Sequence, residues 1–316
     1  MKQRPFSQVD VFTKHPYLGN PVAVVLDGAG LDAETMQKFA QWTQLSETTF
    51  VLPPTKAAQA QGADYRVRIF TPGGELPFAG HPTLGTAHAW REAGGKAQHP
   101  DRVVQECAVG LVRIQRADPL GAWAFAAPAL QRHDVQADEL QAVCDALGMD
   151  SALVLRAQHL NNGPQWLGLL LHKPATVMRL LPDHAALKKI GIKVGVAALH
   201  EVQSVPALIG RANREAMAFA KTSHNTNPPE KKDLETALEV RAFAAAIGIP
   251  EDPVTGSLNA SLAQWLIAEG LLPTRYVASQ GTVLGREGRI TVEQDATGQV
   301  WVGGQSVTCI RGQVLL

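Results

Sequence analysis

The stretch Glu251-Asp252-Pro253-Val254-Thr255-Gly256-Ser257 has the composition of a helix N-terminus. Asp252 is a residue type that caps helices, because its carboxylate accepts from the first free backbone N–H groups. Pro253 suits the first helical position, where no N–H is needed. Apolar residues then recur at helical spacing from Leu258 to Leu266. We expect a helix anchored in a core, with an N-terminus that binds a carboxylate or phosphate.

A second stretch, Gly80-His81-Pro82-Thr83-Leu84-Gly85-Thr86, repeats this arrangement of a polar side chain, a proline and small residues. A strand-like run with arginine and phenylalanine precedes each copy, at residues 65–70 and 238–243. A tryptophan follows in each helix. Several features in the same order predict an internal duplication. Two such domains would place their helices face to face across a cleft, a favoured location for a ligand site.

The composition indicates a globular protein with enough apolar residues for a full core. The chain has 316 residues, of which 45% are hydrophobic and 18% charged, a length that suits two domains. Twenty-nine basic and 29 acidic side chains give a formal net charge of zero, which argues against a nucleic-acid partner or an anionic membrane surface. No apolar run is long enough to span a bilayer, and no signal-peptide pattern opens the sequence.

The three cysteines, Cys107, Cys144 and Cys309, are scattered without a Cys-x-x-Cys motif or a nearby histidine pair. This spacing argues against both a zinc site and a disulfide framework. A reduced, cytoplasmic enzyme fits these observations best.

Glu47 stands where a helical pattern gives way to an apolar, β-branched strand pattern. Its neighbours Ser46, Thr48 and Thr49 all carry hydroxyl groups. A carboxylate in this place is either a satisfied residue at a strand edge or a reactive group on a rigid frame. Its surroundings leave both interpretations open.

Six segments together resemble the PhzF-like isomerases of phenazine biosynthesis. They are Val9-Asp10-Val11-Phe12-Thr13, Gly19-Asn20-Pro21-Val22-Ala23-Val24-Val25, Ser46-Glu47-Thr48-Thr49-Phe50-Val51, Arg68-Ile69-Phe70-Thr71-Pro72, Glu75-Leu76-Pro77-Phe78-Ala79-Gly80-His81-Pro82-Thr83 and Gly248-Ile249-Pro250-Glu251-Asp252-Pro253-Val254-Thr255-Gly256-Ser257. The resemblance implies the α+β fold of diaminopimelate epimerase. In that fold each of two similar domains is a curled, mostly antiparallel sheet around a central helix, with the active site in the interdomain cleft. We place the domains at residues 1–127 and 128–316, with the last strands returning to the first domain.

The resemblance also implies a cofactor-independent isomerase that moves a proton between carbons of a small carboxylate-bearing metabolite. Glu47 would be the general acid/base, because burial raises the pKa of a carboxyl group toward neutrality. The implied catalytic set is Glu47, His81, Asp252 and Ser257, and the substrate-binding set is Asn20, Gly80, Thr83, Thr255 and Gly256. No metal, cofactor, nucleic acid or membrane is implied, and a homodimer is expected.

Alternatives to this assignment follow from the same residues. His81 has the competing interpretation of a structural helix-cap histidine, and Asp252 that of a simple N-cap. Ser257 does not lie in a Gly-x-Ser-x-Gly motif, so a serine hydrolase is disfavoured. No cysteine lies near either helix start, which disfavours a two-thiol racemase. A non-catalytic module that binds a small carboxylate in the same cleft is the main rival.

Two departures from the family pattern concern the second half of the site. The segment Arg241-Ala242-Phe243-Ala244-Ala245 has alanine where a proline is usual in the family, and the polar stretch at residues 221–232 is interpreted as an inserted, exposed loop. Both departures bear on the identity of the substrate more than on the class of mechanism.

Overall fold

The computed structural model describes residues 1–118, 121–200 and 236–316, and the polar stretch at 221–232 lies outside these ranges. The strands are β1 (Gln3–Val11), β2 (Asn20–Val25), β3 (Glu47–Leu52), β4 (Tyr65–Thr71), β5 (Gly74–Leu76), β6 (Arg102–Cys107), β7 (Gly110–Arg116), β8 (Trp123–Ala126), β9 (Gln131–His133), β10 (Val154–Asn161), β11 (Gln165–Leu171), β12 (Val194–Leu199), β13 (Thr236–Ala244), β14 (Ile249–Asp252), β15 (Arg275–Gln280), β16 (Gly288–Gln294), β17 (Val300–Gly304) and β18 (Ser306–Leu315). The α-helices are α1 (Ala33–Thr43), α2 (Lys56–Ala60), α3 (Gly80–Glu92), α4 (Ala137–Leu147), α5 (Pro174–Arg179), α6 (His184–Ile190) and α7 (Gly256–Ala268).

The strands form one continuous sheet in which the same pattern of neighbours occurs twice. Strands β2 and β3 are parallel, β3 and β4 antiparallel, and β4 and β6 parallel. In the same way β11 and β12 are parallel, β12 and β13 antiparallel, and β13 and β15 parallel. Two antiparallel strands then complete each repeat, β7 and β8 in the first and β16 and β17 in the second. The repeated order of motifs in the sequence thus corresponds to a repeated order of strand pairing.

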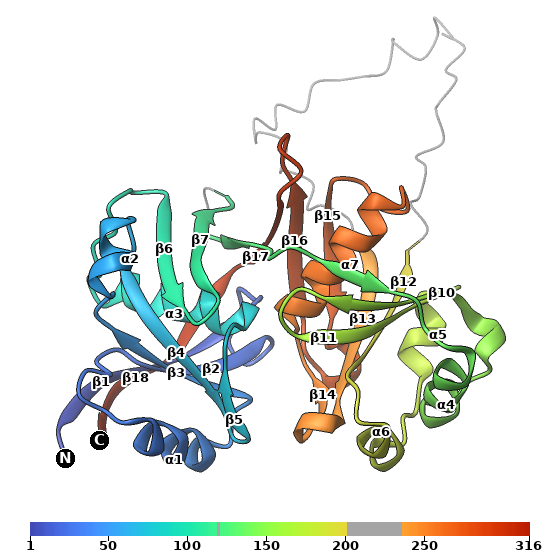
Figure 1. Cartoon of the computed structure of the whole chain (residues 1–316), viewed down its shortest axis with the longest axis horizontal. Helices are drawn as coiled ribbons and strands as arrows, with labels where there is room; N and C mark the ends of the chain where they lie inside the picture. Colours follow the sequence, from blue (N-terminus) through green and yellow to red (C-terminus); the bar gives the residue numbers. More distant parts are fainter. Residues whose placement is uncertain (119–120, 201–235) are drawn as a thin grey trace, which may run out of the picture.

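Each repeat is followed by a strand that pairs with the other repeat. Strand β9 follows the first repeat but pairs with β10, and β18 follows the second but pairs with β1. The β1–β18 pairing runs from Gln3 opposite Leu315 to Val11 opposite Ser306, with one register shift. The strands therefore form two sets. One set consists of β1–β8 together with β18, and the other consists of β9–β17. Figure 1 shows β18 beside β1, with both ends of the chain close together.

The helices α3 and α7 lie within these two sets of strands (Figure 1). Helix α3 contacts β1, β2, β3, β8 and β18, whereas α7 contacts β10, β16 and β17. Buried residues occur on all sides of α7 between Gly256 and Leu266, which is typical of a helix enclosed by a core. One hydrophobic cluster includes Leu84 of α3 as well as Leu258 of α7. This shared core makes the positions of the two helix N-termini depend on each other.

The architecture is a mixed α/β fold with a large curled sheet and few helices. The sheet positions the site because β2, β3 and β14 each begin or end where α3 and α7 start. Asn20 is the first residue of β2, Glu47 is the first residue of β3, and Asp252 is the last residue of β14.

Candidate active site

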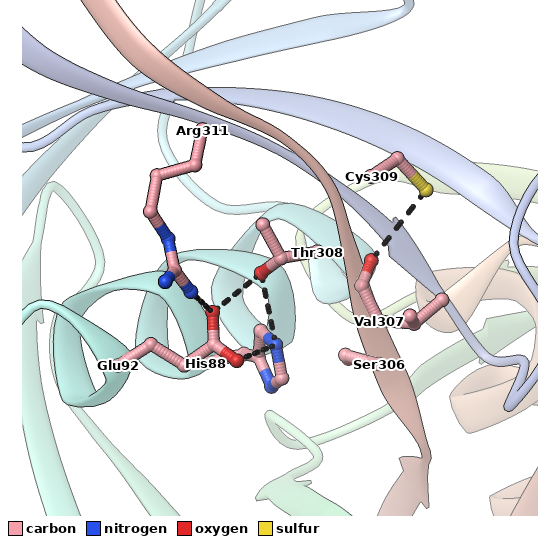
Figure 2. A pocket seen from close by; sticks show the side chains of 7 residues that line it. All are labelled: His88, Glu92, Ser306, Val307, Thr308, Cys309 and Arg311. Atoms are coloured by element: carbon pink, nitrogen blue, oxygen red, sulfur yellow. Dashed lines mark hydrogen bonds and ion pairs between the residues drawn. The ribbon is translucent and has the colours of Figure 1, made fainter.

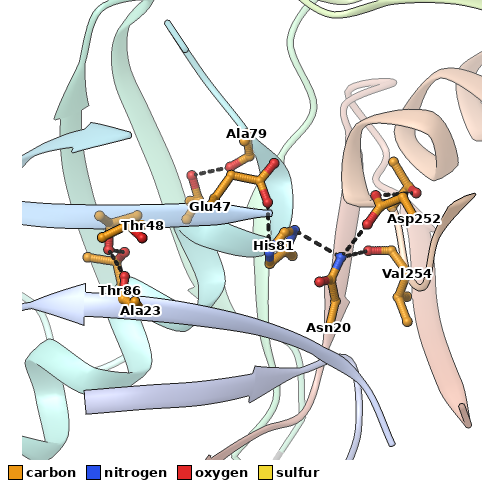
Figure 3. Close-up of polar contacts among 12 residues, drawn as sticks. Asn20, Ala23, Glu47, Thr48, Ala79, His81, Thr86, Asp252 and Val254 are labelled. Carbon is orange, nitrogen blue, oxygen red and sulfur yellow. Dashed lines mark hydrogen bonds and ion pairs between the residues drawn. The ribbon is translucent and has the colours of Figure 1, made fainter. Parts of the chain in front are cut away.

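Glu47 faces His81, the second residue of α3 (Figure 3). Glu47 Oε2 lies 3.3 Å from His81 Nε2, and the two side chains are 12% and 4% exposed. Burial raises the pKa of Glu47 to about 7, although the Ser46 hydroxyl and the charge of Lys193 oppose the rise. Burial lowers the pKa of His81 to about 4, against the opposing effect of Asp252. At neutral pH His81 is therefore uncharged and Glu47 is close to half protonated, which suits proton transfer in both directions.

Asn20 connects this pair to the segment that leads into α7. Its Nδ2 group donates to Asp252 Oδ1 at 2.7 Å and to Val254 O at 2.8 Å, and it lies 3.3 Å from His81 Nδ1 (Figure 3). Asn20 Oδ1 is buried and has no hydrogen-bond partner within the described ranges. The Asn20 amide nitrogen therefore holds Asp252 and Val254 in place, and the amide oxygen remains as a buried acceptor that a ligand could use.

Asp252 does not cap α7, which corrects the expectation from the sequence. It ends β14, opposite Ala242 on β13, and α7 begins four positions later at Gly256. Its second carboxylate oxygen accepts from the Thr255 hydroxyl at 2.6 Å. Burial, reinforced by the nearby charge of Glu47, raises the pKa of Asp252 to about 6. The side chain that resembled a helix cap is instead a second, partly buried acid beside Glu47.

The two helix N-termini meet at Gly80, the first residue of α3, and Gly256, the first residue of α7. A Cβ atom on Gly256 would lie 3.0 Å from Gly80 Cα and 3.2 Å from His81 N, so a larger residue would require the facing backbone to shift. The N-cap residues, Ala79 and Thr255, make no side-chain cap hydrogen bond. Uncapped N–H groups at the positive ends of two 13-residue helices have the properties of an anion site.

The hydroxyl-bearing residues predicted from the sequence differ in their freedom to bind a ligand. The hydroxyl groups of Thr83 and Thr255 each donate to one protein group and accept from another. Ser257 Oγ accepts from Trp166 Nε1 at 3.2 Å. Within the described part of the chain Ser257 Oγ donates to no acceptor, so its hydrogen remains available to a ligand.

Lys193 is a charged neighbour of the site that the sequence does not single out. It lies directly before β12, and its Nζ is 4.8 Å from the centre of the Trp166 ring. Burial lowers the pKa of Lys193 to about 8, while the charges of Glu47 and Asp252 oppose that change. A lysine at the edge of an apolar strand forms no recognisable motif, so the sequence gives no signal for its position.

A cavity of about 400 Å³ lies elsewhere, between α3 and β18 (Figure 2). Its polar side chains bind one another, since Thr308 Oγ1 and Arg311 Nη2 donate to Glu92 Oε2 at 2.6 and 2.7 Å. His88 Nε2 lies 3.2 Å from Thr308 Oγ1. The cavity contains none of the predicted site residues, and its contacts attach β18 to α3.

Two further observations concern metal sites and membrane-spanning helices. In residues 1–118, 121–200 and 236–316, no group of three or more histidine, cysteine or acidic side chains is arranged to hold a metal ion. None of the helices in these same ranges is long and apolar enough to cross a membrane.

Comparison with known proteins places the chain in a family. Residues 9–312 match the family described as phenazine biosynthesis-like protein. The antisense-enhancing sequence 1 of Schizosaccharomyces pombe is 33% identical, over 99% of both chains. The trans-2,3-dihydro-3-hydroxyanthranilate isomerase of Pseudomonas aeruginosa is 31% identical, over 98% of both chains.

Solved structures show the same fold. A PhzF-family protein from Bacillus anthracis superposes with a TM-score of 0.78 at 24% identity, over 100% of both chains. A hydroxyproline epimerase from Agrobacterium vitis gives a TM-score of 0.56 at 14% identity, over 99% of this chain and 92% of the other. The fold and its relatives define an enzyme of the isomerase class with an epimerase-like architecture. The chain belongs to the phenazine biosynthesis-like family.

Proposed function

We propose that the chain is a cofactor-independent isomerase that moves a proton between two carbons of a small carboxylate-bearing metabolite. The observation that carries this proposal is the buried Glu47–His81 pair at the junction of two uncapped helix N-termini. A carboxyl group with a pKa near 7 is present in both protonation states at neutral pH. It therefore serves as a base toward one carbon and as an acid toward the next.

The proton shift proceeds in two steps at the Glu47 carboxylate. In the first step Glu47 accepts a proton from a carbon of the substrate, and the electron pair of the broken C–H bond delocalises toward the substrate carboxylate or a neighbouring double bond. In the second step the protonated Glu47 returns the proton to a different carbon. Glu47 ends in its starting state, so no net oxidation or reduction takes place.

The remaining site residues stabilise the delocalised charge and hold the substrate. The backbone N–H groups at Gly80 and Gly256 bind the substrate carboxylate, where the two helix dipoles offset developing negative charge. Neutral His81 orients Glu47, and Asp252 with Ser257 contacts the substrate from the α7 side. The buried Asn20 Oδ1 accepts from a substrate N–H or O–H group.

The two threonines of the predicted substrate-binding set hold the helix starts in place. Thr83 donates to the carbonyl of Ala79, which precedes α3, and Thr255 donates to Asp252. Both hydroxyl groups are satisfied by protein partners, and this favours a supporting role over direct contact with the substrate.

The site lies in a cleft between two domains in this proposal. The first domain consists mainly of residues 1–127 and the second of residues 128–316, with β18 returned to the first. The strand-pairing repeat and the meeting of Gly80 with Gly256 support this division. We further expect a homodimer in the cytoplasm, and light scattering of the purified protein would test the oligomeric state.

Proton-exchange NMR in D₂O tests the function directly. Wild type, Glu47→Gln and Glu34→Gln are incubated with trans-2,3-dihydro-3-hydroxyanthranilate and with a panel of small unsaturated and amino carboxylic acids. Glu34 is a matched control because its side chain is 75% exposed on α1. We expect carbon-bound deuterium with wild type and Glu34→Gln, and a loss of about 100-fold or more with Glu47→Gln.

Other outcomes separate the enzyme from its main rival. Tight binding of a panel member without exchange in any variant would favour the non-catalytic binding module. Equal exchange by wild type and Glu47→Gln would remove Glu47 from the acid/base role while leaving an isomerase in place.

A further inference from the structure

Lys193 presents an ammonium group on the α7 side of the site. The aromatic face of Trp166 holds its Nζ at 4.8 Å from the ring centre. Trp166 Nε1 in turn donates to Ser257 Oγ in the first turn of α7, and Leu167 N donates to Lys193 O at 2.8 Å. The lysine is thus attached at its backbone and at its charged end to elements that position the helix start.

Of the two acidic groups near Lys193, Asp252 is engaged by other residues, whereas Glu47 Oε2 has no hydrogen-bond partner within the described ranges. Asp252 Oδ1 accepts from Asn20, and Asp252 Oδ2 accepts from Thr255. Glu47 Oε2 faces His81. Across residues 1–118, 121–200 and 236–316, Lys193 Nζ forms no ion pair and no hydrogen bond. The Lys193 side chain is half-buried, and its ammonium keeps three N–H donors available to a ligand.

We propose that Lys193 binds a second acidic group of the substrate, so that the preferred substrates are small dicarboxylates. This inference rests on the proposed function, because it assigns the first carboxylate to the N-termini of α3 and α7. The second carboxylate lies against Lys193 and Trp166, and the carbons between the two groups pass Glu47. The charge of Lys193 also lies within range of both Glu47 and Asp252.

A matched pair of acids provides the test. Trans-glutaconate and trans-2-pentenoate both have five carbons, a conjugated carboxylate and acidic protons at C4, but only glutaconate has a second carboxylate. Affinities are measured by calorimetry at pH 7, where a lysine pKa of about 8 keeps Lys193 charged. The proteins are wild type, Lys193→Gln, Lys193→Arg and Lys189→Gln, a control in the last turn of α6.

We expect wild type, Lys193→Arg and Lys189→Gln to bind glutaconate about 10-fold to 100-fold more tightly than 2-pentenoate, the range of a charge-assisted hydrogen bond. Lys193→Gln is expected to lose this preference while it binds 2-pentenoate as wild type does. Retained binding of the monoacid shows that the variant is folded and its site intact.

Three results would overturn the proposal: equal affinity of wild type for both acids, an unchanged preference in Lys193→Gln, or no binding of either acid. Glu47→Gln separates the two proposals, because it should abolish exchange and keep the preference for glutaconate. Loss of exchange in Glu47→Gln together with no diacid preference in wild type would leave the isomerase standing and reject the role of Lys193.

Discussion

The Asn20 amide donates to Asp252 Oδ1 at 2.7 Å, although the two residues are 232 positions apart in the sequence. The same nitrogen donates to the Val254 carbonyl, so one side chain joins the start of β2 to the segment before α7. The bond to a partly buried carboxylate is charge-assisted, and such bonds are among the strong ones in proteins. This contact makes the second acid of the site depend on the first repeat of the chain.

Asn20→Ala should destabilise the protein and loosen the site. Asp252 and Val254 would both lose a buried donor, and we expect the free energy of unfolding to fall by about 1–3 kcal/mol. Asn20→Asp should cost more, because it places a like charge beside Asp252. Urea unfolding measures both changes. Asn161→Ala is the control, since among the described residues the Asn161 side chain accepts only an exposed turn N–H from Gly163. Equal losses in both alanine variants would contradict the prediction.

Gly256→Ala should separate the two helix N-termini. The added Cβ atom would meet backbone atoms of Gly80 and His81 at 3.0–3.2 Å, and backbone yields less easily than a flexible side chain. We expect a loss of about 1–3 kcal/mol in the free energy of unfolding and a higher KM for carboxylate substrates. Gly312→Ala is a matched control, because a Cβ there meets nothing within 4 Å. Unchanged KM in Gly256→Ala would argue against anion binding at this junction.

The rate of proton exchange should fall as the pH drops below about 7. Glu47 must be ionised to accept a proton, and burial raises its pKa to about 7. Below that value the ionised fraction falls about tenfold per pH unit. Asp252, with a pKa of about 6, titrates in the same range, whereas His81 stays neutral down to about pH 4. Exchange rates between pH 5 and 9 provide the measurement, and a flat profile over that range would contradict the assignment.

Glu47→Gln should stabilise the protein at high pH. The pKa of Glu47 is about 7 in the folded protein, whereas the ordinary value for an exposed glutamate is 4.5. Between these values the folded chain holds a proton that the unfolded chain has lost, so wild-type stability falls as the pH rises from 4.5 through 7. The variant carries no such proton. We expect its gain in unfolding free energy over wild type to be about 1–3 kcal/mol larger at pH 8 than at pH 5.

Denaturant unfolding at the two pH values measures this gain. The control is Glu34→Gln, which alters an exposed carboxylate on α1. A gain for Glu47→Gln that did not change with pH would show that the folded protein does not raise the pKa of Glu47.

Structural features that depend on residues close together in the chain could be predicted from the sequence. A helix at each of the two motifs follows from small residues placed before apolar helical patterns, although α7 begins at Gly256 and not at Pro253. The position of Glu47 at the start of β3 follows from the change between two periodicities. The repeated order of strand, helix and turn motifs reflects short-range patterns in the same way.

Features that depend on distant contacts were not accessible. Asp252 before Pro253 carries the local signal of an N-cap. In the structure it is the last residue of β14, and its carboxylate accepts from Asn20 and Thr255. Its neighbour Glu251 looks equally suited to a site, yet it forms a buried ion pair with Arg241 at 2.8 Å. The place of Lys193 over Trp166 depends on the parallel pairing of β11 and β12. Asn20 is 232 positions from Asp252, and Trp166 precedes Lys193 by most of a strand and two helices, so no short window of sequence contains either pair.

The exchange of β9 and β18 between the repeats has a consequence for how the chain reaches its native state. During synthesis residues 3–11 leave the ribosome long before residues 306–315, so one edge of β1 waits for a partner nearly 300 residues away. An unpaired strand edge invites association with other chains, which makes this interval the vulnerable stage of biogenesis. Closure of that edge is a late step that needs both repeats. The protein should therefore unfold as one cooperative unit, with no stable half left behind.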